Sequence, residues 1–190
     1  MTRALALVLT MALCSVQPAG AHTLDEYVQA TLISLEPGRV NLSVRLTPGT
    51  EVFDAVMKVV DTDADGVISV EESRRYADRV LGDLRLSIDG RRLTPSVVSV
   101  SVPPTERLRE GMDAIRIELT AHLPEGGERR RLVLENHHLS GISAYLVNCL
   151  VPRDSRLEVQ AQHRSSNQAA YQLDYVQNRP LLEPSTGSSR

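Results

Sequence analysis

The stretch YVQATLISLEPGRVNLSVRL, residues 27–46, contains two runs that favour β-strands, Tyr27 to Leu35 and Arg39 to Leu46. Each run is rich in Val, Ile, Leu and Thr, with polar residues between many of the apolar ones. Glu36-Pro37-Gly38 separates the runs and supplies residues that end strands and form turns. The stretch therefore predicts a β-hairpin at the start of a sheet protein.

Seven further strand candidates follow this hairpin. Leu84 to Ile88 alternates and ends at Asp89-Gly90, a strong hairpin-turn signal. In Ala114 to Ala121 the residues Ile115, Ile117 and Leu119 share one face, as in a strand with one buried side. The other candidates are Val97 to Val102, Arg131 to Glu135, Ser143 to Val151, Leu157 to Gln162 and Gln172 to Val176. Many short strands with regular turns predict a mainly antiparallel β-sandwich or open barrel.

The segment from Glu51 to Asp83 departs from this pattern because its apolar residues recur at helical spacing. Pro48 and Thr50 suit the start of a helix. The apolar positions are Phe53, Val56, Met57 and Val60, and later Tyr76, Ala77, Val80 and Leu81. We therefore predict an α+β domain, residues 22–178, in which a helix–loop–helix is inserted between the second and third strands.

Between these helices, the twelve residues DTDADGVISVEE at positions 61–72 have the spacing of a calcium loop. Calcium binds about six to eight oxygens, so a short loop must wrap around the ion and supply ligands from alternate positions. Gly66 permits the sharp turn that this wrapping needs. The expected ligands are the carboxylates of Asp61, Asp63 and Asp65, the backbone carbonyl of Val67, Ser69 directly or through water, and both carboxylate oxygens of Glu72.

The loop and its flanking helices resemble the EF-hand family over residues 51–83. The resemblance implies one Ca²⁺ ion as cofactor and, at Ile68, a short backbone bridge of the kind that pairs two hands. This sequence contains a single hand, which favours a structural site over a sensor that opens when calcium binds. The alternative is an acidic turn that binds no ion.

The N-terminal residues 1–21 have the layout of a secretory signal peptide. A positive start precedes the uncharged, mostly apolar run Ala4 to Val16, and Ala19-Gly20-Ala21 supplies the small residues of a cleavage site. Cleavage there would leave a periplasmic or secreted protein that begins at His22. The later apolar run Ile142 to Val151 is shorter than the about 20 residues of a membrane helix and predicts a buried strand. The polar residues 179–190 predict a disordered tail.

The charge distribution and the cysteines narrow the function classes. The net charge is −3 and no strong basic patch is evident, which argues against a nucleic-acid partner. Arg129-Arg130-Arg131 is a basic run that predicts a solvated strand edge. Cys14 leaves with the signal peptide, so Cys149 stays alone and forms no internal disulfide. Its apolar neighbours predict a small buried side chain.

Histidines provide a second candidate site. After cleavage His22 would offer an amine and an imidazole, a pair that chelates copper or nickel if His137 or His138 lies near. Neighbouring residues of a strand point to opposite faces, so His137 and His138 do not easily share one metal. No GxSxG, HExxH or CxxC motif is present, and a hydrolase without a recognisable motif is the third possibility.

A wider resemblance rests on three stretches: HTLDEYVQAT at 22–31, LTPG at 46–49, and NHHLS at 136–140 with AYLVN at 144–148. They resemble the extracytoplasmic N-terminal domain of bacterial HupE/UreJ-like membrane proteins. The resemblance implies a domain that precedes membrane helices with a role in metal transport, particularly of nickel. This sequence carries no such helices after the domain, so no metal-transport residue is assigned.

Taken together, the sequence favours a non-enzymatic, calcium-stabilised binding or interaction module of the cell envelope, whose partner is an envelope or membrane protein. The second hypothesis is a periplasmic metal-handling accessory protein that uses nickel or copper. The third is an unrecognised hydrolase.

Overall fold

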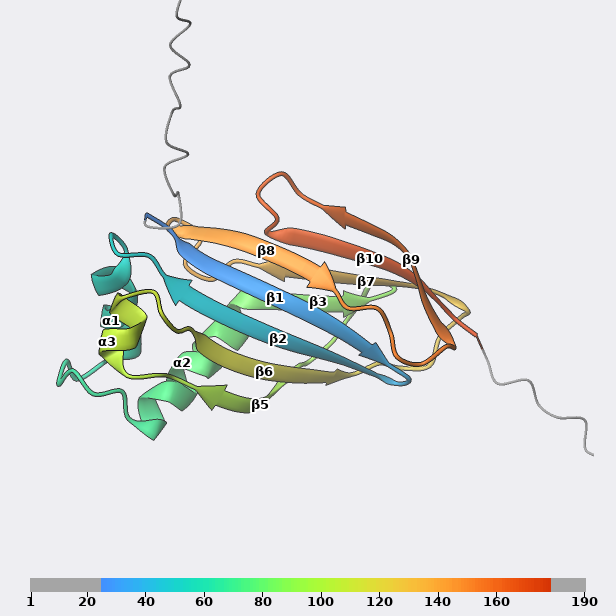
Figure 1. The fold of residues 1–190 in the computed structure, drawn as a ribbon. Helices are drawn as coiled ribbons and strands as arrows, with labels where there is room; N and C mark the ends of the chain where they lie inside the picture. The colour runs from blue at the N-terminus through green and yellow to red at the C-terminus, as the bar shows by residue number, and fades with distance from the viewer. Residues whose placement is uncertain (1–24, 179–190) are drawn as a thin grey trace, which may run out of the picture.

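Two five-stranded sheets face each other in the computed structural model, which describes residues 25–178 (Figure 1). The strand order of the first sheet is β5 (Ser96–Ser101), β6 (Ile115–His122), β2 (Arg39–Pro48), β1 (Tyr27–Glu36) and β8 (Ser143–Cys149). That of the second is β4 (Arg91–Arg92), β3 (Leu84–Ile88), β7 (Arg129–Asn136), β10 (Ala170–Gln177) and β9 (Leu157–Arg164). The predicted α+β class with a mainly antiparallel sandwich is confirmed. The signal peptide, His22 and the tail from 179 lie outside the described residues.

The predicted hairpin is present as β1–β2, and its register places Tyr27 opposite Pro48 and Glu36 opposite Arg39. Pro37 and Gly38 form the turn. Along both strands alternate residues are buried, because a strand presents successive side chains to opposite faces. Every paired strand is antiparallel to its neighbour except β8, which runs parallel to β1.

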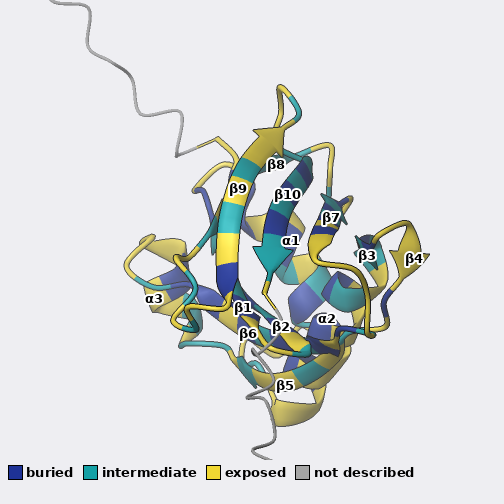
Figure 2. Ribbon diagram, turned by 90° about the vertical axis from the view of Figure 1, so that its right-hand side faces the viewer, coloured by how far each residue is buried: buried dark blue, intermediate teal, exposed yellow. Residues whose placement is uncertain are grey.

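One hydrophobic core lies between the sheets and extends under the helices. Figure 2 colours the ribbon by burial, and dark blue, buried residues recur along the strands and on helix α2. The predicted face of β6 is buried as expected, with Ile115, Ile117 and Leu119 at most 1% exposed. The second sheet contributes Leu132, Leu134, Tyr171, Leu173 and Tyr175.

Helix α1 (Phe53–Val60) and helix α2 (Val70–Asp83) form the predicted helix–loop–helix between β2 and β3. Helix α1 begins at Phe53, later than Pro48 and Thr50 suggest, because Pro48 still pairs within β2. Helix α2 contacts β5 and β3, one strand from each sheet, and so covers one open side of the sandwich.

Several expectations differ from the structure. The short strand β4 and the helix α3 (Thr105–Arg109) were not predicted. The run 142–151 was expected to be a buried strand, but β8 is an edge strand that buries Tyr145 and Val147 and leaves Leu146 48% exposed. Arg129 to Arg131 lie on β7, an inner strand of the second sheet, and Arg130 is buried. Within residues 25–178, no helix has the length and apolar content needed to cross a membrane.

Candidate metal centre

The loop that begins at Asp61 lies between two helices that the sandwich holds in place. Helix α1 buries Phe53, Val56 and Val60, and α2 buries Tyr76, Ala77 and Val80. Helix α2 begins with a capping box, in which the Ser69 hydroxyl accepts a hydrogen bond from the Glu72 backbone N–H and the Glu72 carboxylate accepts one from the Ser69 backbone N–H. The ends of the loop are therefore fixed by packing and capping before any ligand is considered.

Three of the predicted ligands converge. One carboxylate oxygen from each of Asp61, Asp63 and Asp65 lies within 4.8 Å of the others. This is the one such group of three or more metal-ligating side chains in the part of the chain that the structure describes. Asp61 is partly buried, and its Oδ1 is shielded from solvent without a hydrogen-bond partner. A shielded carboxylate oxygen without a donor is costly, and a cation at this position would satisfy it.

The loop backbone wraps toward the three aspartates. The Gly66 N–H donates to Asp61 Oδ2 at 3.0 Å, and the Val67 N–H donates to Asp65 Oδ1 at 2.7 Å. Gly66 has φ +84°, a left-handed conformation that glycine adopts without the strain of a Cβ. The turn predicted at Gly66 is therefore present.

Glu72 has a different environment from the other predicted ligands. Its Oε1 accepts hydrogen bonds from the Thr62 N–H at 2.7 Å and the Thr62 hydroxyl at 3.0 Å. Its Oε2 accepts from the Ser69 N–H at 3.0 Å and the Ser69 hydroxyl at 2.8 Å. The Ser69 donors, and then those of Thr62, lower the pKa of Glu72 to about 2. Glu72 is thus an ionised, buried carboxylate that joins both ends of the loop, although it is not in the three-aspartate group.

A short helix that the sequence did not reveal supports the loop. The hydroxyl of Thr105, the first residue of α3, donates to the Gly66 carbonyl at 3.1 Å. Arg109, at the other end of α3, lies 3.4 Å from Asp54 and places its guanidinium 4.2 Å from the Phe53 ring centre. Helix α3 therefore contacts both the loop and α1, and a small cavity beside Ile68 is lined by residues 102–106.

No protein-family model, curated protein or solved structure matches this chain. The candidate site therefore rests on the geometry of its own residues.

Unlike the three aspartates, His137 and His138 of the metal-handling hypothesis do not converge on one site. His138 is fully buried, and both ring nitrogens have partners: Nδ1 lies 2.7 Å from Asp83 Oδ2, and Nε2 lies 3.0 Å from the Tyr76 hydroxyl. His137 is exposed and lies 3.4 Å from a Glu135 carboxylate oxygen. Both residues follow the end of β7 in the connection to β8 rather than lying in a strand, and one side chain is exposed while the other is buried.

His138 is the centre of a buried polar network that sequence spacing does not disclose. Its backbone carbonyl accepts hydrogen bonds from Gln29 and Tyr145, and its N–H donates to Asn136 Oδ1. Tyr76 continues the network to the Tyr27 hydroxyl. Helix α2, strand β1 and the β7–β8 connection are therefore joined through polar atoms that solvent does not reach.

Cys149 is partly buried rather than fully buried, and this partial burial raises the pKa of its thiol to about 11. A thiol with a raised pKa is a weak nucleophile at neutral pH, because the thiolate is the reactive form.

Proposed function

We propose that this chain is an exported protein with one structural, EF-hand-like calcium site, and that it serves as a binding or interaction module of the cell envelope. The observation that carries the proposal is the convergence of Asp61, Asp63 and Asp65 within 4.8 Å in a loop of the expected length. The shielded, unpartnered Oδ1 of Asp61 supports a cation at the same place. Oxygen ligands alone suit a hard cation such as Ca²⁺.

The role of the site is structural rather than sensory. A sensor hand opens and exposes an apolar groove. Here the apolar faces of α1 and α2 are already covered by the sandwich, with Phe53, Val56 and Tyr76 at most 1% exposed. Calcium should therefore tighten the segment from Phe53 to Leu81 without exposing new apolar surface.

A groove beside the site supports the interaction role. It lies between α2 and β5, has a volume of about 660 Å³, and includes Val70 and Val98, which are 69% and 64% exposed. Strand β5 pairs only with β6, so its outer edge presents unpaired backbone groups to this groove. Exposed apolar residues beside a free strand edge are typical of surfaces that bind other proteins.

Thermal unfolding with and without calcium tests the proposal. At free calcium 100-fold above Kd, binding to the folded state adds about 2.7 kcal/mol to the free energy of unfolding. For a domain of this size that corresponds to a rise in Tm of about 5–11 °C. Glu72→Gln should remove most of the calcium-dependent rise. Glu71→Gln is the matched control because Glu71 is exposed and is not an expected ligand.

The outcome is judged on the difference in Tm with and without calcium, because Glu72→Gln also disturbs the capping box. A wild-type Tm that calcium does not change contradicts the proposal, as does an equal loss in both variants. Metal analysis of the purified protein complements the assay: stoichiometric copper or nickel in place of calcium would favour the metal-handling hypothesis.

A further inference from the structure

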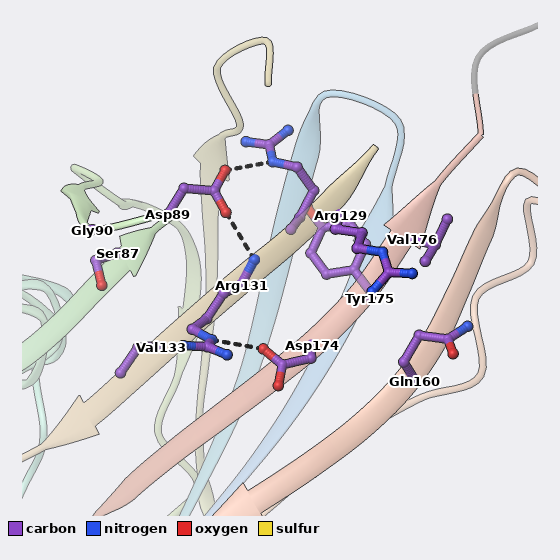
Figure 3. Close-up of a pocket in the computed structure, with 11 residues that line it drawn as sticks. Ser87, Asp89, Gly90, Arg129, Arg131, Val133, Gln160, Asp174, Tyr175 and Val176 are labelled. Carbon is purple, nitrogen blue, oxygen red and sulfur yellow. Dashed lines mark hydrogen bonds and ion pairs between the residues drawn. The ribbon is translucent and has the colours of Figure 1, made fainter. Parts of the chain in front are cut away.

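A hollow on the outer face of the second sheet belongs to no site described so far (Figure 3). Its volume is about 710 Å³, within the range of small-molecule sites. Side chains of β7 and β10 form its floor, and the β3–β4 turn closes one side. Strand β7 pairs with β3 on one side and β10 on the other, so the floor is a rigid, preorganised surface.

The three consecutive arginines of β7 line this hollow, but only two of them are neutralised. Arg130 forms an ion pair with Asp89 at 2.6 Å, and Arg131 forms one with Asp174 at 2.8 Å. The Arg129 side chain makes no hydrogen bond or ion pair with any residue from 25 to 178. Figure 3 shows dashed lines at Asp89 and Asp174 and none at Arg129. The hollow thus has one unbalanced positive charge on a chain of net charge −3.

The free guanidinium lies beside apolar surface. Arg129 is directly opposite Val176 in the register of β7 and β10, so their side chains share one face. Val133, four residues further along β7 on the same face and beyond the Arg131–Asp174 ion pair, supplies a second apolar wall. Arg91 and Glu125 line the adjoining smaller cavity together with Arg129. Their opposite charges cancel, so the net charge around Arg129 stays positive by one.

We propose that this hollow binds a small organic anion, a carboxylate on an apolar body, with Arg129 paired to the carboxylate and the body resting on Val176 and Val133. Arginine presents two parallel N–H groups that match the two oxygens of a carboxylate. The single excess charge suits a monoanion better than a phosphate, whose charge at neutral pH is about −1.5 to −2. A bare inorganic anion would leave the apolar side chains of Val176 and Val133 uncovered, whereas an apolar body would cover them.

Octanoate is the probe, and octanamide is its neutral counterpart of the same shape. Titration into the isotopically labelled full-length protein, followed by NMR, should shift resonances of residues 129–133 and 174–176. Octanoate should bind at least tenfold more tightly than octanamide, since a charge-assisted pair is worth roughly tenfold or more in affinity. Arg129→Gln should weaken octanoate binding by the same factor without disturbing the fold, because Arg129 is exposed and has no partner to lose.

Arg45→Gln is the matched control, because Arg45 is exposed on β2 of the other sheet. This variant should bind octanoate as the wild type does. Equal affinity for octanoate and octanamide would overturn the proposal, and so would equal losses in Arg129→Gln and Arg45→Gln. Inorganic phosphate that displaces octanoate at comparable concentration would overturn the assignment of a carboxylate. Calcium does not enter the assay, so its outcome is independent of the loop site.

Discussion

Removing the hydroxyl of Tyr76 should destabilise the protein more than removing that of Tyr27, although the two hydroxyls bond to each other. The direction of the chain of hydrogen bonds explains this. His138 Nδ1 faces the carboxylate of Asp83, so the ring proton is assigned to Nδ1 and Nε2 accepts from the Tyr76 hydroxyl. Tyr76 has then used its proton, and Tyr27 must donate to it.

The magnitudes follow from which atoms lose a partner. Tyr76→Phe leaves two buried groups without partners, the Tyr27 O–H and His138 Nε2. Each such group costs about 1–3 kcal/mol, so we expect a total loss of about 2–6 kcal/mol. Tyr27→Phe removes one bond but leaves Tyr76 donating to His138, so we expect a loss of about 1 kcal/mol. In the double variant the unpaired Tyr27 hydroxyl is absent, and the loss should return to about 2 kcal/mol.

Urea unfolding of the wild type, the two single variants and the double variant at one calcium concentration measures these differences. The four midpoints form a double-mutant cycle, and the coupling between the two residues should be at least about 1 kcal/mol. Strictly additive losses would refute the proposed chain of hydrogen bonds. A larger loss for Tyr27→Phe than for Tyr76→Phe would refute its direction.

Three other perturbations have expected outcomes. Burial lowers the pKa of His138, opposed by Asp83, so the unfolded chain takes up the proton first as the pH falls below about 6.5. The free energy of unfolding should therefore fall between pH 7 and 5.5, and less so in His138→Gln; equal slopes would contradict this. Gly66→Ala should lower the free energy of unfolding by about 1–2 kcal/mol, because Gly66 has a positive φ. Gly82→Ala on α2 should raise it by about 0.5–1 kcal/mol, because alanine favours a helix more than glycine does. Thermal melts in which both variants shift Tm in the same direction would exclude this explanation. Thr105→Val should weaken calcium binding about 2- to 10-fold in a calorimetric titration by removing the bond to Gly66, and unchanged affinity would show that α3 does not support the loop.

Local sequence pattern predicted much of the fold because each of these elements has a short-range cause. The alternation in β1, β2 and β6 corresponds to one buried and one outer face. Asp89 and Gly90 both have positive φ, as a two-residue hairpin turn of this type requires. Helices α1 and α2 follow from apolar spacing of about 3.6 residues.

The features that the sequence missed depend on long-range contacts or on very short elements. Strand β4 has two residues and α3 has five, too few to show a period. The parallel pairing of β1 with β8 joins residues more than one hundred positions apart, for which no local signal exists. Arg130 was expected to be solvated, but it is buried because Asp89, 41 residues away, supplies a partner for its charge.

At the candidate site, too, the sequence predicted the features with a local cause and missed those that depend on tertiary contacts. Spacing alone predicted the convergence of Asp61, Asp63 and Asp65, because neighbouring residues of a tight turn must lie close together. It did not predict that donors from Thr62 and Ser69 would surround Glu72, because that arrangement depends on how the two helices are oriented.

The position of Glu72 bears on how the loop responds to an ion. A carboxylate has about four acceptor sites, and the four donors of Thr62 and Ser69 occupy that number. These bonds already connect the start of the loop to the start of α2, while Thr105 holds Gly66 from outside. A cation that Glu72 ligates would replace some of these donors, while the ends of the loop stay at the separation that the helices and the capping box set. Under the proposed function, a cation would stabilise the single hand without a large change of shape, which is the behaviour that a structural site requires and a sensor does not.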